Sequence, residues 1–409
     1  MCRNVGKMTT KNTVSIKKRK IGEKLFNNVE SNSFLSKYIT TGNLDFLLVV
    51  VTTLLVVFGV VMVFSASYYN SINDYGTPYS YLKSQGGYAI TGFILMYVAS
   101  KLDYRIWRRF AFPFAFIGLV LLGLIFTPLG VEVNGATRWL NLIVITIMPG
   151  EIAKAVMIIL CATYFSRDMK RARSLRGLLP IVIYTVVVCF AIVKQPNLST
   201  AITVFLIAVG IAFVAGMEWR YIILMGAGTL VGGYYLLYID KGYWHSRVAS
   251  FLDPFADALG DGFQVVQSLL ALGTGGLWGK GLGQSVQKNL YLPEPQNDFI
   301  LAIIGEELGF IGIAVLLIVF AIMIWRILYI SLQSKDNFGM LLGSGVAVMI
   351  GVQVILNVAV VTSSMPPTGI ALPFISAGGN ALWIFMGLIG IVLNISRTIN
   401  KDEEKEERK

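Results

Sequence analysis

Histidine and cysteine are scarce in this chain of 409 residues, which contains one His and three Cys. Zinc sites take several His or Cys ligands, so the composition argues against a site of that kind. Cys161 and Cys189 fall inside apolar segments and Cys2 lies in a basic tail, so we expect no disulfide framework. The single histidine, His245, lies in a loop, and we interpret it as interfacial or structural rather than catalytic.

Charged residues are scarce too, at 14% of the chain, whereas a soluble domain carries about 25%. Hydrophobic residues make up 55% of the chain, and long apolar runs recur throughout. Such runs are typical of membrane-spanning helices, while a β-barrel would show alternating polarity instead. The sequence therefore predicts an all-α polytopic membrane protein.

Acidic residues are outnumbered by basic ones, giving a net charge of +11. A basic chain can bind nucleic acid, but the placement of the charge indicates otherwise, because residues 1–40 hold nine Lys or Arg against two Glu. A basic tail beside a membrane span is a topology signal and attracts anionic lipid. We expect no nucleic-acid partner. No apolar core with a small-residue cleavage site follows Met1 closely, so we expect no cleaved signal peptide.

Ten apolar segments are predicted to span the membrane, with both chain termini on the cytoplasmic side. They are approximately 46–66, 82–100, 110–127, 149–165, 178–194, 199–216, 220–238, 299–325, 341–362 and 376–396. The loops that fall inside are basic, as the positive-inside rule requires. The expected organisation is a basic cytoplasmic tail (1–44), a transmembrane domain (45–397) with an extracytoplasmic loop at about 239–298 between the seventh and eighth helices, and a charged cytoplasmic tail (398–409). We expect residues 400–409 to be disordered.

The stretch 287–312 runs from a proline-broken polar segment into Asp298 and then into an apolar helix that carries Glu306 and Glu307. Ionisable residues at or below the mouth of a spanning helix are costly and usually mark a functional site. The alternative is an ordinary carboxylate at a helix N-terminus, where the helix dipole favours negative charge. Asp298 is the candidate that the rest of the chain supports.

The stretch 134–154 is a second candidate. Arg138 and Trp139 precede an apolar stretch too short to span, which we interpret as interfacial or re-entrant. Pro149 is expected to begin a helix. Glu151 and Lys154 are three residues apart, so they share a helix face and can pair. They form either a structural ion pair or, with Arg138, a cationic platform for an anionic headgroup.

The stretch 194–200 reads KQPNLST, and Pro196 breaks the backbone between two predicted spans. Gln195 and Asn197 are then available as polar contacts. The alternative interpretation is a turn followed by a helix whose N-cap is Ser199.

The stretch 261–285 is amphipathic and then glycine-rich, which suggests a nucleotide-binding loop. That hypothesis fails because no strand precedes the glycines and no Ser or Thr follows Lys280. Close backbone packing against lipid or substrate suits these glycines better. The stretch 363–380, rich in Pro and Gly, is expected to wall a cavity, since irregular backbone near a membrane must be buried in protein or face water.

Taken together, these stretches resemble the SEDS family (shape, elongation, division, sporulation), whose members include FtsW and RodA. The matching motifs are GATRW (135–139), PGEIAK (149–154), QPNLST (195–200), FQVVQSLLALGTGGLWGKGLG (263–283), YLPEPQNDFILAIIGEELGFIG (291–312) and PPTGIALPFISAGGN (366–380). The resemblance covers about residues 45–397. The phrase GQSVQKNLYLPE (283–294) is more similar to the FtsW and sporulation branch than to RodA.

The resemblance implies a peptidoglycan glycosyltransferase that polymerises lipid II on the outer face of the bacterial cytoplasmic membrane, with undecaprenyl pyrophosphate as the leaving group and inversion at the sugar. It implies a class B penicillin-binding protein and other division proteins as partners, and a place at the division septum. Asp298 corresponds to the family's essential acid, as general base, as a ligand of Mg²⁺ or Mn²⁺, or as both. The residues implied to bind substrate are Arg138, Glu151, Lys154, Gln195, Asn197, Gln264, Lys280 and Glu294.

The chain departs from the family pattern at several positions. Asn197 replaces the Asp of a QPD motif, and Gly150 and Asn297 change PSE to PGE and TDF to NDF. Gln296 stands where the family has His, and residues 376–380 read SAGGN where a SYGGS-like motif is expected. Asp298, Glu151 and Lys154 are retained, so the sequence predicts an active enzyme. The alternatives are a lipid II flippase and a non-catalytic scaffold that activates the transpeptidase.

Overall fold

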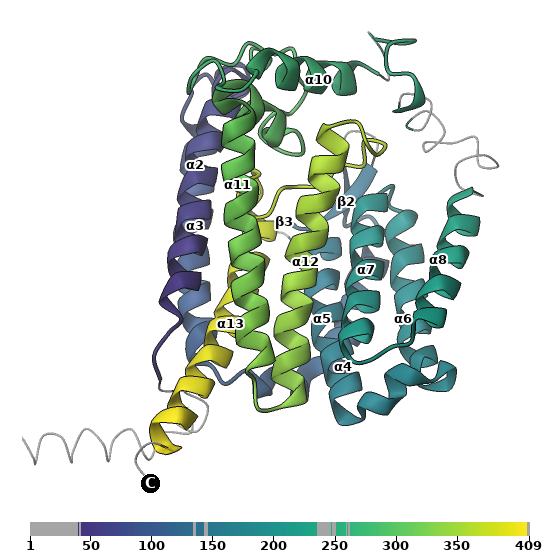
Figure 1. Ribbon diagram of the computed structural model, residues 1–409. Helices are drawn as coiled ribbons and strands as arrows, with labels where there is room; N and C mark the ends of the chain where they lie inside the picture. Colours follow the sequence, from purple (N-terminus) through teal and green to yellow (C-terminus); the bar gives the residue numbers. More distant parts are fainter. Residues whose placement is uncertain are drawn as a thin grey trace, which may run out of the picture.

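A computed structural model describes residues 40, 42–133, 136–142, 146–234, 247, 251–258, 260 and 262–406 (Figure 1). Within these ranges the chain forms a bundle of helices with one small sheet. The helices are α2 (Phe46–Tyr75), α3 (Ser80–Lys101), α4 (Arg105–Leu124), α5 (Pro149–Arg167), a 3₁₀ turn (Met169–Arg173), α6 (Leu175–Val193), α7 (Leu198–Val214), α8 (Trp219–Tyr234), α10 (Phe263–Gly275), α11 (Ile300–Leu332), α12 (Asn337–Val361) and α13 (Gly379–Glu406). The strands are β1 (Gly130–Val133), β2 (Ala136–Asn141) and β3 (Thr146–Ile147).

Each of the ten predicted spans overlaps one of these helices. Seven described helices are long and apolar enough to cross a membrane, namely α2, α4, α5, α6, α11, α12 and α13, while α7 is apolar but shorter. The polytopic helical class is confirmed, and the count of ten spans stays a prediction. The basic tail predicted at 1–44 lies almost wholly outside the described residues, as does His245.

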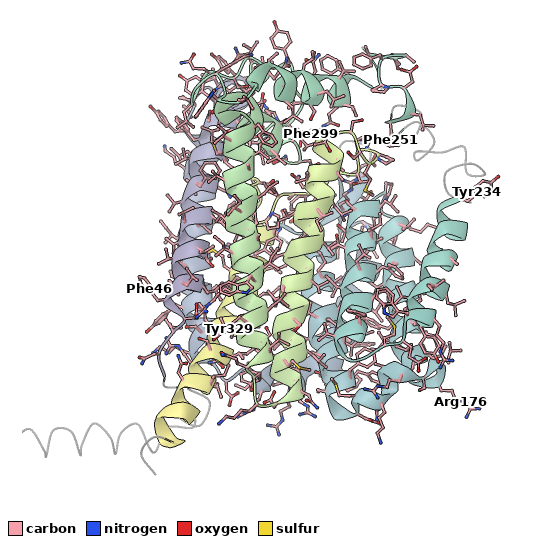
Figure 2. All side chains as sticks on the ribbon, viewed as in Figure 1. Phe46, Arg176, Tyr234, Phe251, Phe299 and Tyr329 are labelled. Atoms are coloured by element: carbon pink, nitrogen blue, oxygen red, sulfur yellow. The ribbon has the colours of Figure 1, made fainter. Side chains whose placement is uncertain are left out.

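The core of the bundle lies around α5, α12 and α13. Of the most apolar stretches of these helices, 78%, 67% and 78% of the residues are buried, against 22% for α4 and 28% for α6. The outer helices therefore turn large apolar side chains such as Phe116 and Phe190 away from the protein, as helices in contact with lipid do. Helix α10 caps one end of the bundle in Figure 1, and Arg176, labelled in Figure 2, lies at the opposite end.

Helix α11 is broken at Gly309, whose φ of 70° and ψ of −172° are not helical. A Cβ at Gly305 would lie 2.9 Å from Cδ1 of Ile313, although eight residues of straight helix advance about 12 Å. The buried half-helix 300–308 therefore folds back against the segment 310–332. At about 1.5 Å per residue, the second segment alone is long enough to span a membrane.

This break corrects the span predicted at 299–325, which is two helical pieces rather than one. It frees two carbonyl and two N–H groups, and the glycine-rich loop after α10 pairs with all four. The bonds run from Lys280 N to Glu306 O (2.9 Å), Gly281 N to Glu307 O (2.9 Å), Phe310 N to Gly276 O (2.9 Å) and Ile311 N to Leu277 O (3.2 Å). Gly275 and Gly279 thus pack against the backbone of α11, where an added Cβ would clash with Gly305 O and Glu307 O. Irregular backbone beside a membrane is tolerated because it is satisfied in this way. Contact of the other loop glycines with lipid or substrate stays a prediction.

A small antiparallel sheet, in the order β1-β2-β3, lies between α4 and α5. The apolar stretch after Trp139, interpreted above as interfacial or re-entrant, instead contributes to strands, with Leu140 opposite Ile147. Alternate residues of a strand face the same side. Arg138 therefore shares a face with Ala136 and Leu140, which are both buried.

The C-terminal run is helical where disorder was expected, because α13 continues to Glu406. Glu and Lys are good helix formers. Adding residues to an existing helix avoids the cost of nucleation. The prediction of a disordered tail at 400–409 is therefore wrong for residues 400–406.

Candidate active site

A cavity of about 1190 Å³ lies at the end of the bundle that carries α10. The ends of α2 and α12, the starts of α3, α5, α7 and α13, the sheet and the loops all contribute to its wall. Its charged and amide-bearing residues are Asn70, Asp74, Gln85, Arg138, Glu151, Lys154, Arg247, Gln264, Glu294, Gln296, Asn297, Asp298, Gln353 and Asn380. The predicted wall 363–380 is confirmed by residues 367–371 and 377–380. Phe299, labelled in Figure 2, is buried beside this region.

Asp298 lies two residues before the buried half-helix begins at Ile300. Its carboxylate approaches Gly369 and Arg138, because a Cβ at Gly369 would lie 3.0 Å from Asp298 Oδ2 and 3.6 Å from Arg138 Nη1. Gly369 has a φ of +71°, a conformation that glycine adopts without strain. The acid and the guanidinium group therefore both lie close to a position that has no side chain.

Burial raises the pKa of Asp298 from 3.8 to about 6. The positive charge of Arg138 opposes this rise, the negative charge of Glu294 adds to it, and Arg247 opposes it. A general base acts best when its pKa lies near the working pH. The environment of Asp298 therefore suits an acid that gains and loses a proton near neutrality.

Arg138 is fixed by the loop that precedes α7. Its Nη2 donates a hydrogen bond to the carbonyl oxygen of Pro196, while its Nε is buried with no hydrogen-bond partner in the described part of the chain. Buried polar groups without a partner are rare in proteins and call for a bound water or ligand. Arg138 on β2 is thus a fixed cation whose Nε–H group is still available to bind an anionic ligand.

Glu151 and Lys154 pair as the sequence predicts, with Nζ 2.6 Å from Oε1. Pro149 begins α5, also as predicted. Lys154 is 1% exposed and Glu151 is 7% exposed, so the pair lies at the buried side of the cavity wall. The second oxygen of Glu151 has no partner among the described residues. This arrangement holds the ammonium group of Lys154 in place, and only one of its three donors is used by Glu151.

Gln195 and Asn197 do not line the cavity. Gln195 is buried and donates to the carbonyl of Leu122 (3.3 Å). Asn197 is the N-cap of α7, and its Oδ1 accepts from Thr200 N at 3.3 Å, so the alternative interpretation with Ser199 as the N-cap is wrong. Both side chains therefore form hydrogen bonds within the protein and do not face the cavity.

Ser199 has a different use, since its hydroxyl donates to the carbonyl of Thr368 at 2.8 Å. Thr368 precedes Gly369, so the start of α7 holds the segment that faces Asp298. The same stretch also holds Arg138 through the carbonyl of Pro196. The motif 195–200 thus positions two parts of the site through Pro196 and Ser199, which do not line the cavity, while Thr200 of the same motif does line it.

Lys280, predicted to bind substrate, lies away from the cavity. Its Nζ is 2.7 Å from Glu306 Oε1, and Glu306 is completely buried. Glu307 pairs in the same way with Lys288, at 2.7 Å. These two acids were considered above as possible markers of a site. They instead form ion pairs that hold the segment containing Lys280 and Lys288 against α11. Gln264 and Glu294, the other predicted contacts, do line the cavity.

Arg247 was not predicted as a site residue. It lines the cavity, and its Nη1 donates to the carbonyl of Pro367 (3.4 Å). Gln353 on α12 was missed as well; it is 1% exposed, lines the cavity, and its Oε1 has no partner in the described ranges. A lone arginine in a long loop and a lone glutamine in an apolar helix have no spacing pattern that identifies them.

The departures from the family pattern are compatible with this geometry. A Cβ at Gly150 would lie 3.9 Å from Asn197 Nδ2, so these two substitutions are neighbours in space. Asn197 caps its helix with an oxygen, as an aspartate would. Asn297 donates to Glu294 Oε2 (2.7 Å) and Gln296 accepts from Asn70 (3.1 Å), so both substituted side chains are bonded within the wall.

Within the part of the chain that the structure describes, no three His, Cys, Asp or Glu side chains cluster as a protein-made metal site requires. Mg²⁺ is often bound by one or two carboxylates together with phosphate oxygens of a substrate. The donor set around Asp298 therefore fits a divalent cation only if a substrate supplies further oxygen ligands.

The fold and the cavity define a polytopic helical membrane protein with an acid and fixed cations in a polar cavity at one end of the bundle. The model of the FtsW, RodA and SpoVE family, described as "Cell cycle protein", matches residues 45–401, and the chain belongs to this family. Over 354 residues it is 39% identical to "Probable peptidoglycan glycosyltransferase FtsW" of Geobacter sulfurreducens (strain DL-1 / KN400), covering 86% of this chain and 95% of that protein. It is 38% identical to "Stage V sporulation protein E" of Bacillus subtilis (strain 168) over 357 residues, covering 86% and 97%.

Solved structures have the same fold. A chain from "Structural coordination of polymerization and crosslinking by a peptidoglycan synthase complex" matches with a TM-score of 0.73 and 26% identity, covering 88% of this chain and 99% of that one. The rod shape determining protein RodA of Thermus thermophilus matches with a TM-score of 0.63 and 26% identity, covering 87% and 97%. The multi-pass architecture predicted from the sequence is therefore shared with solved members of the family.

Proposed function

We propose that the protein is a peptidoglycan glycosyltransferase that polymerises lipid II into glycan strands. The observation that supports this most is the approach of Asp298 and Arg138 to each other at Gly369, inside a polar cavity at one end of the bundle. The relatives named FtsW are described as peptidoglycan glycosyltransferases, which supports the same reaction.

In this proposal Asp298 is the general base. The acceptor sugar hydroxyl gives its proton to the carboxylate while its oxygen bonds to the anomeric carbon of the donor. The bond from that carbon to the pyrophosphate oxygen breaks, and undecaprenyl pyrophosphate leaves with the electron pair. One displacement inverts the anomeric centre and needs no covalent enzyme intermediate.

Arg138 and Lys154 are proposed to bind the pyrophosphate, with Arg247 as a third cation of the cavity. Fixed donors stabilise negative charge that develops on a leaving group, because they need no reorganisation during the reaction. Glu151 orients Lys154 through their ion pair. Gln264 and Glu294 are proposed to contact the sugars, since both line the cavity.

We also propose a divalent cation, Mg²⁺ or Mn²⁺, held by Asp298 together with phosphate oxygens of the substrate. When bound, such an ion neutralises charge on the pyrophosphate. A class B penicillin-binding protein and other division proteins are the proposed partners, and the division septum is the proposed location. The similarity to a chain of a synthase complex that couples polymerisation and crosslinking supports a crosslinking partner.

The test is polymerisation of lipid II by purified protein, with and without its transpeptidase and with Mg²⁺ or Mn²⁺. We expect polymer from the wild type and none from Asp298→Asn, which should insert normally. Asp253→Asn is the matched control, because Asp253 is an exposed acid of the same loop region that does not line the cavity. Polymerisation by Asp298→Asn at the wild-type rate would contradict the role given to Asp298.

Two other functions have their own outcomes in related experiments. Protein-dependent movement of labelled lipid II across vesicle membranes without polymer would favour a flippase. Cells that divide normally with Asp298→Asn but not after deletion of the gene would favour a scaffold that activates the transpeptidase.

A further inference from the structure

Asn357 lies on α12, one turn before that helix ends at Val361, and its side chain is completely buried. Its carboxamide nitrogen donates to the carbonyl oxygen of Asp298 at 2.9 Å and to the carbonyl oxygen of Ile370 at 2.7 Å. A carboxamide nitrogen carries two N–H groups, so both are used. One side chain therefore joins the segment that carries the acid to the segment that faces it.

The second segment matters because Ile370 follows Gly369, the residue against which the carboxylate of Asp298 lies. Both carbonyl oxygens lie within 2.9 Å of the same nitrogen. The amide group of Asn357 therefore joins the two segments directly at Asp298 and at the residue that follows Gly369. A buried side chain on a helix is held in one orientation, because packing restricts its rotamers.

Neighbouring bonds hold the same stretch of backbone. The carbonyl of Gln296 accepts from the N–H of Ala377 at 2.9 Å, and the carbonyl of Asn297 accepts from the hydroxyl of Ser376 at 2.7 Å. With the bond from Asn357, three successive carbonyl groups are held. The bond from Asn357 is the one made at the acid itself, and it comes from a membrane-spanning helix.

Asn357 does not line the cavity, so it acts on a substrate only through the residues that it holds. We propose that Asn357 is a positioning residue, which sets the carboxylate of Asp298 against Gly369 and Arg138 by joining their segments through its two N–H groups. This inference rests on the proposed function, since it concerns the geometry of the proposed base. It concerns a residue outside all of the motifs that identify the family resemblance above.

The test compares Asn357→Ala with Asn394→Ala. Asn394 is a matched control because it is a buried asparagine on α13 whose amide donates to the carbonyl of Ser100 at 2.9 Å and whose oxygen accepts from Tyr104 N at 2.9 Å. We expect kcat for lipid II polymerisation to fall about 10- to 100-fold in Asn357→Ala, since small misplacements of a reacting group cost that much. KM should stay within about threefold, and Asn394→Ala should keep kcat within about twofold.

The pH profile provides a readout that a merely structural role would not change. Arg138, Glu294 and Arg247 are the charged groups that act on Asp298. If the carboxylate is released from its buried position, the acidic limb of the profile should move to lower pH in Asn357→Ala and stay in place in Asn394→Ala. The reason is that solvent returns the carboxyl group toward its ordinary pKa.

A second measurement does not depend on turnover. Carbodiimide coupling of Asp298, followed by peptide mass spectrometry over a pH series, reports the ionisation of its carboxyl group directly. We expect the midpoint in Asn357→Ala to lie below that of the wild type. Asn357→Ser, which keeps one hydroxyl donor, should give an intermediate midpoint and serves if the alanine variant does not fold.

A folded variant with wild-type kcat, acidic limb and coupling midpoint would overturn the role given to Asn357. Absence of polymer from the wild type would instead contradict the proposed function. In that case the coupling midpoints would still decide whether Asn357 positions Asp298.

Discussion

Gly369 lies directly against the carboxylate of Asp298, at a distance where a side chain would be crowded. A Cβ at this glycine would lie 3.0 Å from Oδ2 of the acid. Contacts of this length force one of the two groups to move. The absence of a side chain at Gly369 therefore allows the acid to lie beside Arg138 as observed.

Gly369→Ala should lower lipid II polymerisation at least about tenfold. The methyl group would displace the carboxylate, and the φ of +71° would be strained in a residue with a Cβ. Gly378→Ala is the control, since Gly378 also lines the cavity but a Cβ there meets no described atom within 4 Å. Equal activity of the two variants would contradict the idea that the approach of Gly369 to the acid matters.

The pH profile of polymerisation should have an acidic limb near pH 6. Burial raises the pKa of Asp298 to about 6, so the carboxylate form that accepts a proton prevails only above that pH. Below it the rate should fall about tenfold per pH unit. Because Arg138 opposes the rise in pKa, the residual activity of Arg138→Gln should show its limb at higher pH. A limb near pH 4 in the wild type would contradict this account.

Asp298→Asn should be more stable to heat than the wild type at pH 7.5. A carboxyl group whose pKa is raised on folding binds its proton more tightly in the folded state, so the folded state loses stability as pH rises from about 4 to about 6. The amide has no charge to bury and avoids this loss. Thermal unfolding in detergent at pH 4 and pH 7.5 checks the sign, and an equal difference between the two proteins at both pH values would contradict it.

Lys288→Met should destabilise the protein by about 3–5 kcal/mol, because it leaves the buried carboxylate of Glu307 without its cation. The double variant Lys288→Met with Glu307→Leu should recover most of that loss, since removing both charges removes the cost of burying one alone. The contrast is Arg220→Met, which breaks an exposed pair with Glu218 and should cost at most about 1 kcal/mol. Denaturation curves of the variants measure these differences.

Chelation should abolish polymerisation without unfolding the protein. The described residues provide no cluster of three metal-binding side chains, so a divalent cation would be held jointly by Asp298 and the substrate. Treatment with EDTA should therefore leave the thermal midpoint unchanged and stop the reaction, and Mg²⁺ or Mn²⁺ should restore it. A fall in the thermal midpoint on chelation would indicate a structural ion instead.

Much of the site follows from the sequence, because the predicted membrane topology determines at which end of the bundle each motif lies. Spans of known length place Arg138, Lys154 and Asp298 at the same end of the bundle, so their convergence requires little knowledge of the packing. The pair of Glu151 with Lys154 follows from helical spacing alone. These parts of the prediction are confirmed by the cavity and by the ion pair.

The parts that failed depend on three-dimensional detail. Lys280 lies in a glycine-rich loop whose path is set by its bonds to α11, so its sequence neighbours do not indicate that Glu306 takes its charge. Gly309 lies in a helical stretch that also contains Gly305 and Gly312, and the sequence does not distinguish a glycine with positive φ from a helical one. Arg247 lines the cavity but belongs to no motif of the sequence. Asn357 resembles any polar residue of an apolar helix until its two carbonyl partners are known.

Because of the break at Gly309, the segment that follows Asp298 is held by other parts of the chain more than by the helix that continues it in sequence. Asp298 is followed by the half-helix 300–308, yet that piece is joined to the glycine-rich loop by backbone bonds and by the ion pairs of Glu306 and Glu307. A force applied to the loop reaches the acid through rigid secondary structure. A force along the span 310–332 must first pass Gly309, after which the N–H groups of Phe310 and Ile311 bond to the loop. In terms of load, the acid belongs to the glycine-rich loop rather than to the apolar helix segment that follows it in sequence.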